Sequence, residues 1–236
     1  MQLDLTSFDS IKKAADEFKS KSQRLDVLIN NAGIMAVPYS LTKEGYEVQF
    51  GTNHVGTSLF TKLLLPTLSK TASQPNADVR IINLSSEGHQ MAPRDIVYDQ
   101  AALEKQSTFA RYGQSKLANI LHARELQKRY PAITSTALHP GVIITELYAG
   151  LSATTAAARV FMPAARAATS VGLLYDIPAG AKNQLWAATA PKAEVATSHY
   201  WKPVGIKSGG SGQARNEAMA EKLWEWTEGE FKKHGY

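Results

Sequence analysis

The 236-residue chain contains no cysteine, so disulfide bonds, thiolate metal ligands and thiol catalysis are excluded. It also lacks an uncharged apolar run near the ~18 residues that a membrane-spanning helix needs. The richest apolar stretch, residues 156–175, is interrupted by Arg159 and Arg166. Residues 1–5 have neither the basic nor the apolar segment of a signal peptide. We therefore expect a cytoplasmic protein without a membrane span.

An excess of charge of one sign is also missing. The chain has 26 Lys and Arg against 21 Asp and Glu, a net charge of +5. Its basic residues are spread along the chain, whereas nucleic-acid binding calls for a basic cluster. We therefore expect no nucleic-acid partner, although the small positive charge favours an anionic cofactor. Hydrophobic residues make up 44%, as in an ordinary globular protein with a sizeable core.

Short apolar runs alternate with helical patterns along the chain. Residues 25–31, 79–85 and 134–138 are typical of buried parallel strands. The helical patterns cover residues 10–20, 52–68, 113–130 and 216–231, the second of them stopping near Pro66. Alternating strands and helices favour a single α/β domain whose parallel sheet is covered on both faces.

Tyr112 and Lys116 are four residues apart in a helical stretch, so their side chains share one helix face. A neighbouring ammonium stabilises phenolate and lowers the pKa of a tyrosine from about 10. Tyr112 could then exchange a proton near neutral pH. Alone, this spacing is also met by a surface tyrosine that covers a lysine stem.

Further polar residues stand where the predicted strands end. Ser85-Ser86 follow one strand, and Asn30-Asn31-Ala32-Gly33 end another. Asn53 begins the next helix, and Pro140-Gly141-Val142 with Thr145 follow the third strand. Because ligands of α/β proteins bind at the carboxyl ends of parallel strands, we expect these residues to meet at one edge of the sheet.

In these residues the sequence resembles the short-chain dehydrogenase/reductase family, whose members have a Rossmann-type fold and use NAD or NADP. The resemblance covers the whole chain and is greatest to retinol-dehydrogenase-like and fungal carbonyl reductases. It is carried by Asn30–Gly33, Asn53, Ser86, Tyr112, Lys116, Pro140-Gly141 and Thr145, and for the branch by residues 83–89, 115–119 and His139.

The resemblance implies a role for each catalytic residue. Tyr112 would be the general acid or base, and Lys116 would lower its pKa and hold the nicotinamide ribose. Ser86, with Ser85 as the alternative, would bind the reacting oxygen. Asn53 would hold a water that links Lys116 to solvent.

Cofactor contacts are implied in the same way. Asn31, Ala32 and Gly33 would line the adenosine side of the cofactor, with Asp4 near the adenine. Val142 and Thr145 would contact the nicotinamide amide, and Tyr112 and Lys116 would also belong to the cofactor-binding residues. NADP is the expected cofactor, with NAD as the alternative.

The resemblance also implies a substrate and an assembly. The reaction would interconvert an alcohol and a carbonyl, and residues 145–180 would form a variable, apolar substrate-binding region. A lipophilic or aromatic ketone or aldehyde fits that region, and a role in fungal secondary metabolism is allowed. Family members commonly form homodimers or homotetramers through the helices that carry Asn53 and Tyr112.

The sequence departs from the family at its start. The first two β-α units, with their glycine-rich pyrophosphate loop, are absent, and residues 1–5 correspond to the end of the third family strand. That strand would pair directly with residues 25–31, or an apolar edge would be exposed. The glycine-dense residues 205–212 are not expected to replace the missing loop.

Three readings therefore stay open. The chain is an oxidoreductase of the family type, a non-redox proton-transfer enzyme such as an isomerase, dehydratase or cyclase, or a non-catalytic remnant that acts as an interaction protein.

Overall fold

The computed structural model describes residues 1–142 and 175–236. Among these residues, three short helical turns accompany the α-helices: the π-helix η1 and the 3-10 helices η2 and η4. The described elements are, in chain order, α1 (Phe8–Lys21), β1 (Val27–Asn30), α2 (Val48–Phe50), η1 (Gly51–Gly56), α3 (Thr57–Ala72), β2 (Arg80–Leu84), η2 (Glu87–Met91), α4 (Gln100–Lys105), α5 (Thr108–Arg129), β3 (Thr134–Leu138), α8 (Ile177–Thr189), α9 (Lys192–Val195), β4 (Tyr200–Lys202), β5 (Ile206–Ser208), η4 (Gln213–Arg215) and α10 (Glu217–Lys233).

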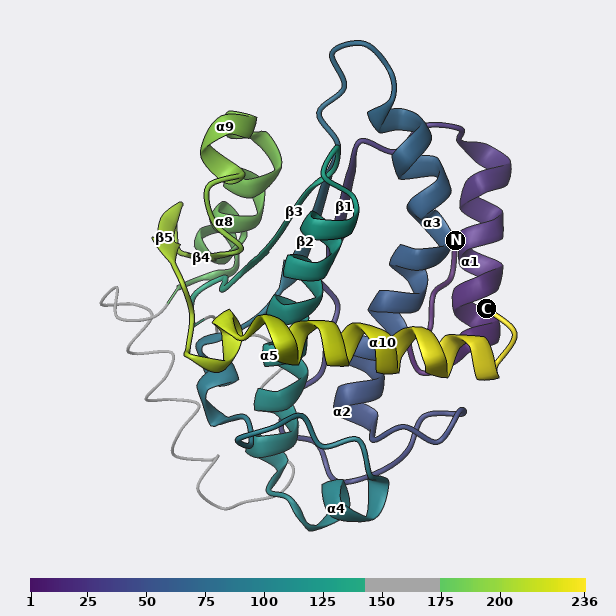
Figure 1. Ribbon diagram of the computed structural model, residues 1–236, viewed down its shortest axis with the longest axis vertical. Coiled ribbons are helices and arrows are strands. Elements are labelled where there is room, and N and C mark those ends of the chain that lie inside the picture. Colours follow the sequence, from purple (N-terminus) through teal and green to yellow (C-terminus); the bar gives the residue numbers. More distant parts are fainter. Residues whose placement is uncertain (143–174) are drawn as a thin grey trace.

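The strands form one sheet in the order β1-β2-β3-β4-β5 (Figure 1). Strands β1 to β4 are parallel, and β5 returns antiparallel to β4 as a hairpin. The register pairs Asn30 with Asn83 and Leu84 with Leu138, so β1, β2 and β3 end along one edge. The predicted α/β class, with a parallel-dominated Rossmann-type sheet between helices, is confirmed.

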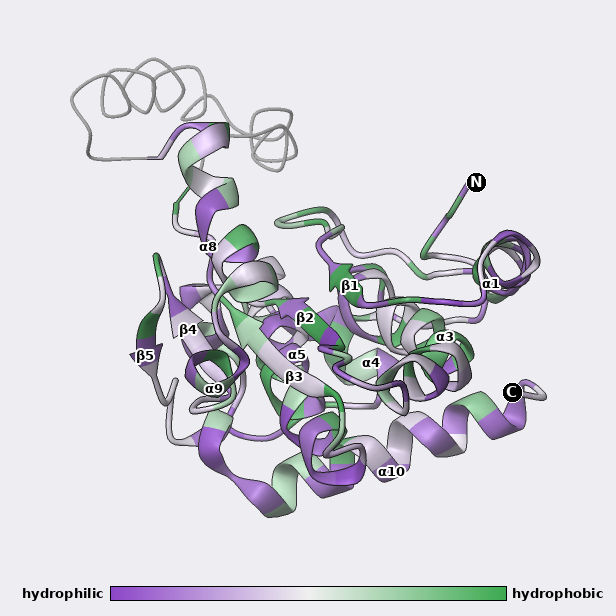
Figure 2. Ribbon diagram, turned by 90° about the horizontal axis from the view of Figure 1, so that it is seen from above, coloured by the Kyte–Doolittle hydropathy of each residue, from purple (hydrophilic) through white to green (hydrophobic). Residues whose placement is uncertain are grey.

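Alternating residues of β2 face two separate hydrophobic clusters. Ile81 belongs to the larger cluster, which α1, α3, α5 and α10 complete on one face of the sheet. Ile82 belongs to a smaller cluster on the other face, where α8 lies and where the rings of Trp186 and Trp201 meet edge to face at 4.6 Å. Figure 2 shows β1, β2 and β3 between these layers, with hydrophobic residues (green) in the strands. None of the described helices is long and apolar enough to cross a membrane.

The helix around Asn53 is longer than the sequence pattern predicts. Pro66 lies inside α3, which continues to Ala72, so the prediction that the helix stops near Pro66 is wrong. A proline removes one backbone hydrogen bond of a helix. The neighbouring Leu64, Leu65 and Leu68 are buried against the core, and their burial outweighs that loss.

Strand β1 is an edge of the described sheet, because its only partner there is β2. Residues 1–5 form no strand, so the direct pairing predicted as one alternative does not occur. The exposed-edge alternative agrees with the side chain of Ile29, which is 36% exposed.

Helix α10 covers the outer side of the helices that carry Asn53 and Tyr112. Trp226 packs against Phe50 with ring centroids 5.7 Å apart, and Trp224 stacks on His122 of α5 at 5.4 Å. Leu223 and Phe231 of the same helix are buried. Helix α10 is thus docked through its tryptophans on Phe50 and on α5 (Figure 1).

Candidate active site

Tyr112 and Lys116 lie side by side on the buried face of α5. Ser107 caps this helix with its side chain, accepting from the N–H of Ala110, so Tyr112 stands in the second turn. The Lys116 Nζ lies 5.7 Å from the centroid of the Tyr112 ring. The two side chains are 4% and 6% exposed. The four-residue spacing thus produces the predicted contact between cation and phenol ring.

Lys116 is buried, and its ammonium makes one hydrogen bond within the described residues, to a neutral group. Its Nζ donates to the carbonyl oxygen of Leu84, at the end of β2, over 3.2 Å. Within the described residues it has no carboxylate partner. Burial lowers the pKa of Lys116 to about 8, so the ammonium form still predominates at pH 7. An ammonium has three donors, so two of them have no partner in residues 1–142 and 175–236 and could serve a ligand.

Ser86 begins the turn that packs on Tyr112. Its Oγ accepts the N–H of Gly88 at 3.0 Å and caps η2. A Cβ atom on Gly88 would lie 2.8 Å from Cε1 of Tyr112, so the backbone of this turn touches the phenol ring. Ser85 is occupied differently, because its Oγ donates to the carbonyl oxygen of Lys116 at 2.8 Å. Of the two serines, Ser86 is the half-buried one beside Tyr112.

Asn53 lies in the π-helical turn η1 and holds the segment that follows β1. Its Oδ1 accepts the N–H of Ile34 at 2.8 Å, and its Nδ2 donates to Ile34 O and to Ser115 Oγ, both at 2.9 Å. A Cβ atom on Gly33 would lie 2.9 Å from Asn53 Oδ1 and 3.2 Å from Lys116 Nζ. Gly33, Asn53 and Lys116 therefore meet, and the absence of a side chain at Gly33 permits this approach.

Some of the residues expected to bind a cofactor lie at the edge of the sheet where β1 and β3 end. Asn31 and Ala32 are exposed just beyond β1, and Val142, 47% exposed, follows β3. The Val142 carbonyl accepts the N–H of Tyr175 at 3.0 Å. Thr145 and most of the 145–180 region lie outside the described residues.

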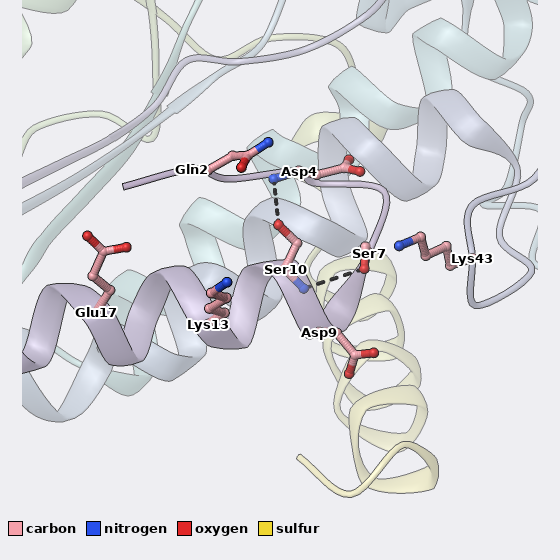
Figure 3. A pocket seen from close by; sticks show the side chains of 8 residues that line it. All are labelled: Gln2, Asp4, Ser7, Asp9, Ser10, Lys13, Glu17 and Lys43. Atoms are coloured by element: carbon pink, nitrogen blue, oxygen red, sulfur yellow. Dashed lines mark hydrogen bonds between the residues drawn. The ribbon is translucent and has the colours of Figure 1, made fainter.

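Asp4 makes its hydrogen bonds near the start of α1. Its backbone N–H donates to Ser10 Oγ at 2.9 Å, and its carboxylate accepts from the N–H and hydroxyl of Thr6. These hydrogen bonds lower the pKa of the Asp4 carboxyl. Figure 3 shows Asp4 beside the first turn of α1, in a polar hollow with Lys13 and Lys43. The hydrogen bonds of Asp4 thus join it to α1 and to the turn that precedes this helix.

The glycine-dense loop 205–212 uses its amides internally. The N–H of Gly205 donates to Asn183 Oδ1, that of Gly210 to Ser208 Oγ, and that of Ser211 to His89 Nε2. A phosphate would have to displace these acceptors, which agrees with the expectation that this loop does not bind pyrophosphate.

Two buried amides near the site were not assigned a role from the sequence. Asn119 Nδ2 donates to Leu84 O at 2.9 Å, the oxygen that also accepts from Lys116. Gln49 bonds the segment between Gly33 and Val37. Helical spacing could have indicated both residues, because Asn119 follows Lys116 by three residues and Gln49 precedes Asn53 by four.

Known proteins are similar in sequence to this chain over nearly its full length. The family "short chain dehydrogenase" matches residues 1–156. The short-chain dehydrogenase/reductase drtF of Aspergillus calidoustus is 38% identical over 99% of this chain and 76% of its own. Retinol dehydrogenase 12 of Mus musculus is 36% identical over 94% of this chain and 66% of its own.

A solved structure shares the fold as well. A crystal structure of an uncharacterized protein from Mycobacterium paratuberculosis superimposes with a TM-score of 0.70 and 31% identity, covering 98% of this chain and 75% of that one. Fold and relatives define an oxidoreductase with a Rossmann-type fold. The chain belongs to the short-chain dehydrogenase/reductase family, in the branch with retinol dehydrogenases and fungal members.

Proposed function

We propose that the chain interconverts an alcohol and a carbonyl compound with a nicotinamide cofactor, through Ser86, Tyr112, Lys116 and Asn53. The observation that carries this proposal is the buried pair of Tyr112 and Lys116, which packs against the Ser86 turn on one side and Gly33 on the other. A buried cation beside a phenol has few structural reasons to exist, because burial of an unpaired charge costs free energy. Proton transfer supplies a reason.

Each residue has one task in this mechanism. Ser86 donates a hydrogen bond to the substrate oxygen and orients it. In the reducing direction Tyr112 gives its hydroxyl proton to that oxygen while the C=O π bond breaks, and in the oxidising direction the phenolate takes the proton back. Lys116 stabilises the phenolate between the two events. The cofactor, when bound, supplies or accepts the hydride at the substrate carbon.

Asn53 belongs to the path that restores the proton. The two amide hydrogens of Asn53 already donate to Ile34 and Ser115. A water would therefore donate a hydrogen bond to an oxygen of Asn53, beside Lys116 and Gly33. This water links the Lys116 ammonium to solvent and reprotonates Tyr112 after each reduction.

The described residues offer the groups that a nicotinamide ribose needs. Lys116 has two unused donors at the edge where Gly33 and Val142 lie, and such donors suit ribose hydroxyls. In this proposal Asn31, Ala32 and Gly33 line the adenosine side, Asp4 lies near the adenine, and Val142 and Thr145 contact the nicotinamide amide. NADP is the proposed form, with NAD as the alternative.

Titration of the purified chain with NADPH tests this function. Transfer of the nicotinamide ring into a protein site is expected to raise its fluorescence to a plateau, with a parallel NADH titration deciding which cofactor binds more tightly. The Tyr112→Phe variant, which keeps the ring and loses only its hydroxyl, should still bind NADPH. A lack of binding at millimolar NADPH and NADH contradicts the redox function, and cofactor-free turnover that depends on Tyr112 would then favour a non-redox proton-transfer enzyme.

The substrate we propose is a lipophilic or aromatic ketone or aldehyde, and its alcohol in the reverse reaction. The composition of residues 145–180 supports this, since Ala, Met and Phe suit an apolar substrate region. Fungal secondary metabolism and a cytoplasmic location remain parts of the proposal that rest on the sequence.

We also propose a homodimer or homotetramer, with a contact surface other than the outer faces of η1 and α5. Helix α10 covers the outer faces of η1 and α5, so assembly through them would have to displace Trp224 and Trp226. We expect light scattering to give a mass of two or four chains, unchanged by Trp224→Ala. A concentration-independent mass near 25.7 kDa would contradict this.

A further inference from the structure

The segment after Gly33 forms a wall against Tyr112. Met35, Ala36 and Tyr112 make up a small buried cluster of their own. Ala36 has a φ of 55°, in the left-handed region, which is strained for a residue with a Cβ atom. Other contacts must therefore hold this segment in place.

Gln49 makes the contacts that hold it. Its Oε1 accepts the N–H of Ala36 at 2.9 Å. Its Nε2 donates to the backbone oxygen and Oγ1 of Thr108, at 3.1 and 3.2 Å. Thr108 Oγ1 in turn donates to Val37 O at 2.9 Å. Fully buried, Gln49 thus joins the wall to the first turn of α5, one turn before Tyr112.

Asn53 fixes the same segment one step earlier. It bonds both the N–H and the carbonyl of Ile34, while Gln49 bonds the N–H of Ala36. The two amides are four residues apart on consecutive helical turns, so they grip adjacent parts of one segment. Loss of Gln49 would free the half that touches the phenol ring.

We propose that Gln49 is a positioning residue for Tyr112. By bonding Ala36 and Thr108 it keeps residues 35–37 in the strained conformation that fixes the phenol ring against the substrate side. This inference rests on the proposed function of Tyr112. It goes beyond that function because Gln49 bonds Ala36 and Thr108, neither of which has a catalytic or cofactor role in the proposal.

The variant Gln49→Met keeps the volume of the side chain and removes its donor and acceptor. We expect kcat to fall about 10²-fold, the effect of a misplacement of about 1 Å at a reacting group. The KM for NADPH should stay within threefold, because Lys116 and Gly33 keep their contacts. Hydrogen exchange of the Ala36 amide should become faster.

Gln114→Met is the matched control. Gln114 is equally buried and clamps another segment, accepting the N–H of Val97 at 2.8 Å and donating to its carbonyl at 2.9 Å. We expect faster exchange at Val97, a comparable loss of stability and a kcat within threefold of the unaltered chain. If both glutamine variants lower kcat equally, Gln49 is only a structural residue and the proposal fails.

A second substitution tests the strain directly. Glycine adopts a positive φ without steric cost, so Ala36→Gly should restore at least tenfold of the kcat lost in Gln49→Met. Absence of this rescue overturns the proposal. If Gln49→Met does not fold, Thr108→Val is the milder variant, because it removes the hydroxyl that bonds Gln49 and Val37. We then expect a smaller loss of kcat. An unchanged kcat in this variant contradicts the proposal.

Tyr112→Phe, measured in parallel, distinguishes a failure of the role proposed for Gln49 from a failure of the proposed function. An inactive Tyr112→Phe with a fully active Gln49→Met overturns the role of Gln49 alone, whereas an active Tyr112→Phe overturns the proposed function. In a preparation without turnover, the NMR signals of the Tyr112 ring, assigned by Tyr112→Phe, take over as the readout. Gln49→Met should shift them and Gln114→Met should not, and equal shifts refute the proposal.

Discussion

Tyr112→Phe is expected to lower kcat about 10³-fold, within the range that a positioned general acid contributes. The phenyl ring keeps the packing against Met35 and Ala36, so the variant should fold and bind NADPH as the unaltered chain does. Only the transferable proton is lost. The measurement is NADPH consumption with a panel of aromatic and lipophilic ketones and aldehydes.

Tyr98→Phe is a suitable control for this substitution. Tyr98 is half-buried against Trp226, and within the described residues its hydroxyl has no hydrogen-bond partner. Removing that hydroxyl should leave kcat within twofold and stability unchanged or slightly higher. More than a tenth of the original activity in Tyr112→Phe would exclude this tyrosine as the proton donor.

Lys116→Met is expected to separate activity from stability. Activity should fall by at least 10²-fold because the phenolate loses its cation. Stability should rise, since the pKa of Lys116 is about 8 in the folded chain against an ordinary value of 10.5. That difference corresponds to a folded-state penalty of about 3 kcal/mol for the charged lysine at pH 7.

The pH dependence has a definite sign. Below pH 8 both folded and unfolded chains carry the proton on Lys116, so the penalty is present in full. Between pH 8 and 10.5 the unfolded chain binds more protons, and the unfolding free energy of the unaltered chain rises with pH. The stability advantage of Lys116→Met should therefore be largest at pH 7 and shrink towards pH 10.

Urea unfolding at pH 7 and pH 9.5 measures this difference. Lys128→Met is the control, because Lys128 is on the same helix with a side chain 61% exposed. Its effect should stay near 0.5 kcal/mol or below at both pH values, as is usual for surface substitutions. A Lys116→Met chain less stable than the unaltered one at pH 7 would contradict the account of a buried, unpaired ammonium.

The sequence predicts the parts of the site that depend on local periodicity. The spacing of Tyr112 and Lys116 fixes their contact once α5 forms. The apolar runs before Asn31 and Ser85 predict two parallel strands, whose ends must share an edge. These inferences need only the repeat of helices and strands, and the structure agrees with them.

Other features depend on contacts between distant segments. The helix passes Pro66 because leucines on both sides are buried, and burial depends on the rest of the fold. Gln49 acts through Ala36 and Thr108, which are 13 and 59 residues away in the chain. A polar side chain at helical spacing gives no indication of which backbone group it will meet.

The distribution of the tryptophans has a practical consequence. All four lie in the last quarter of the chain, yet Trp186 and Trp201 form a pair on one face of the sheet, whereas Trp224 and Trp226 lie on α10 across the other. Intrinsic fluorescence therefore contains two independent reporters. Replacing either pair by phenylalanine leaves an optical probe of one layer, with which the detachment of α10 can be followed separately from the melting of the β4-β5 hairpin.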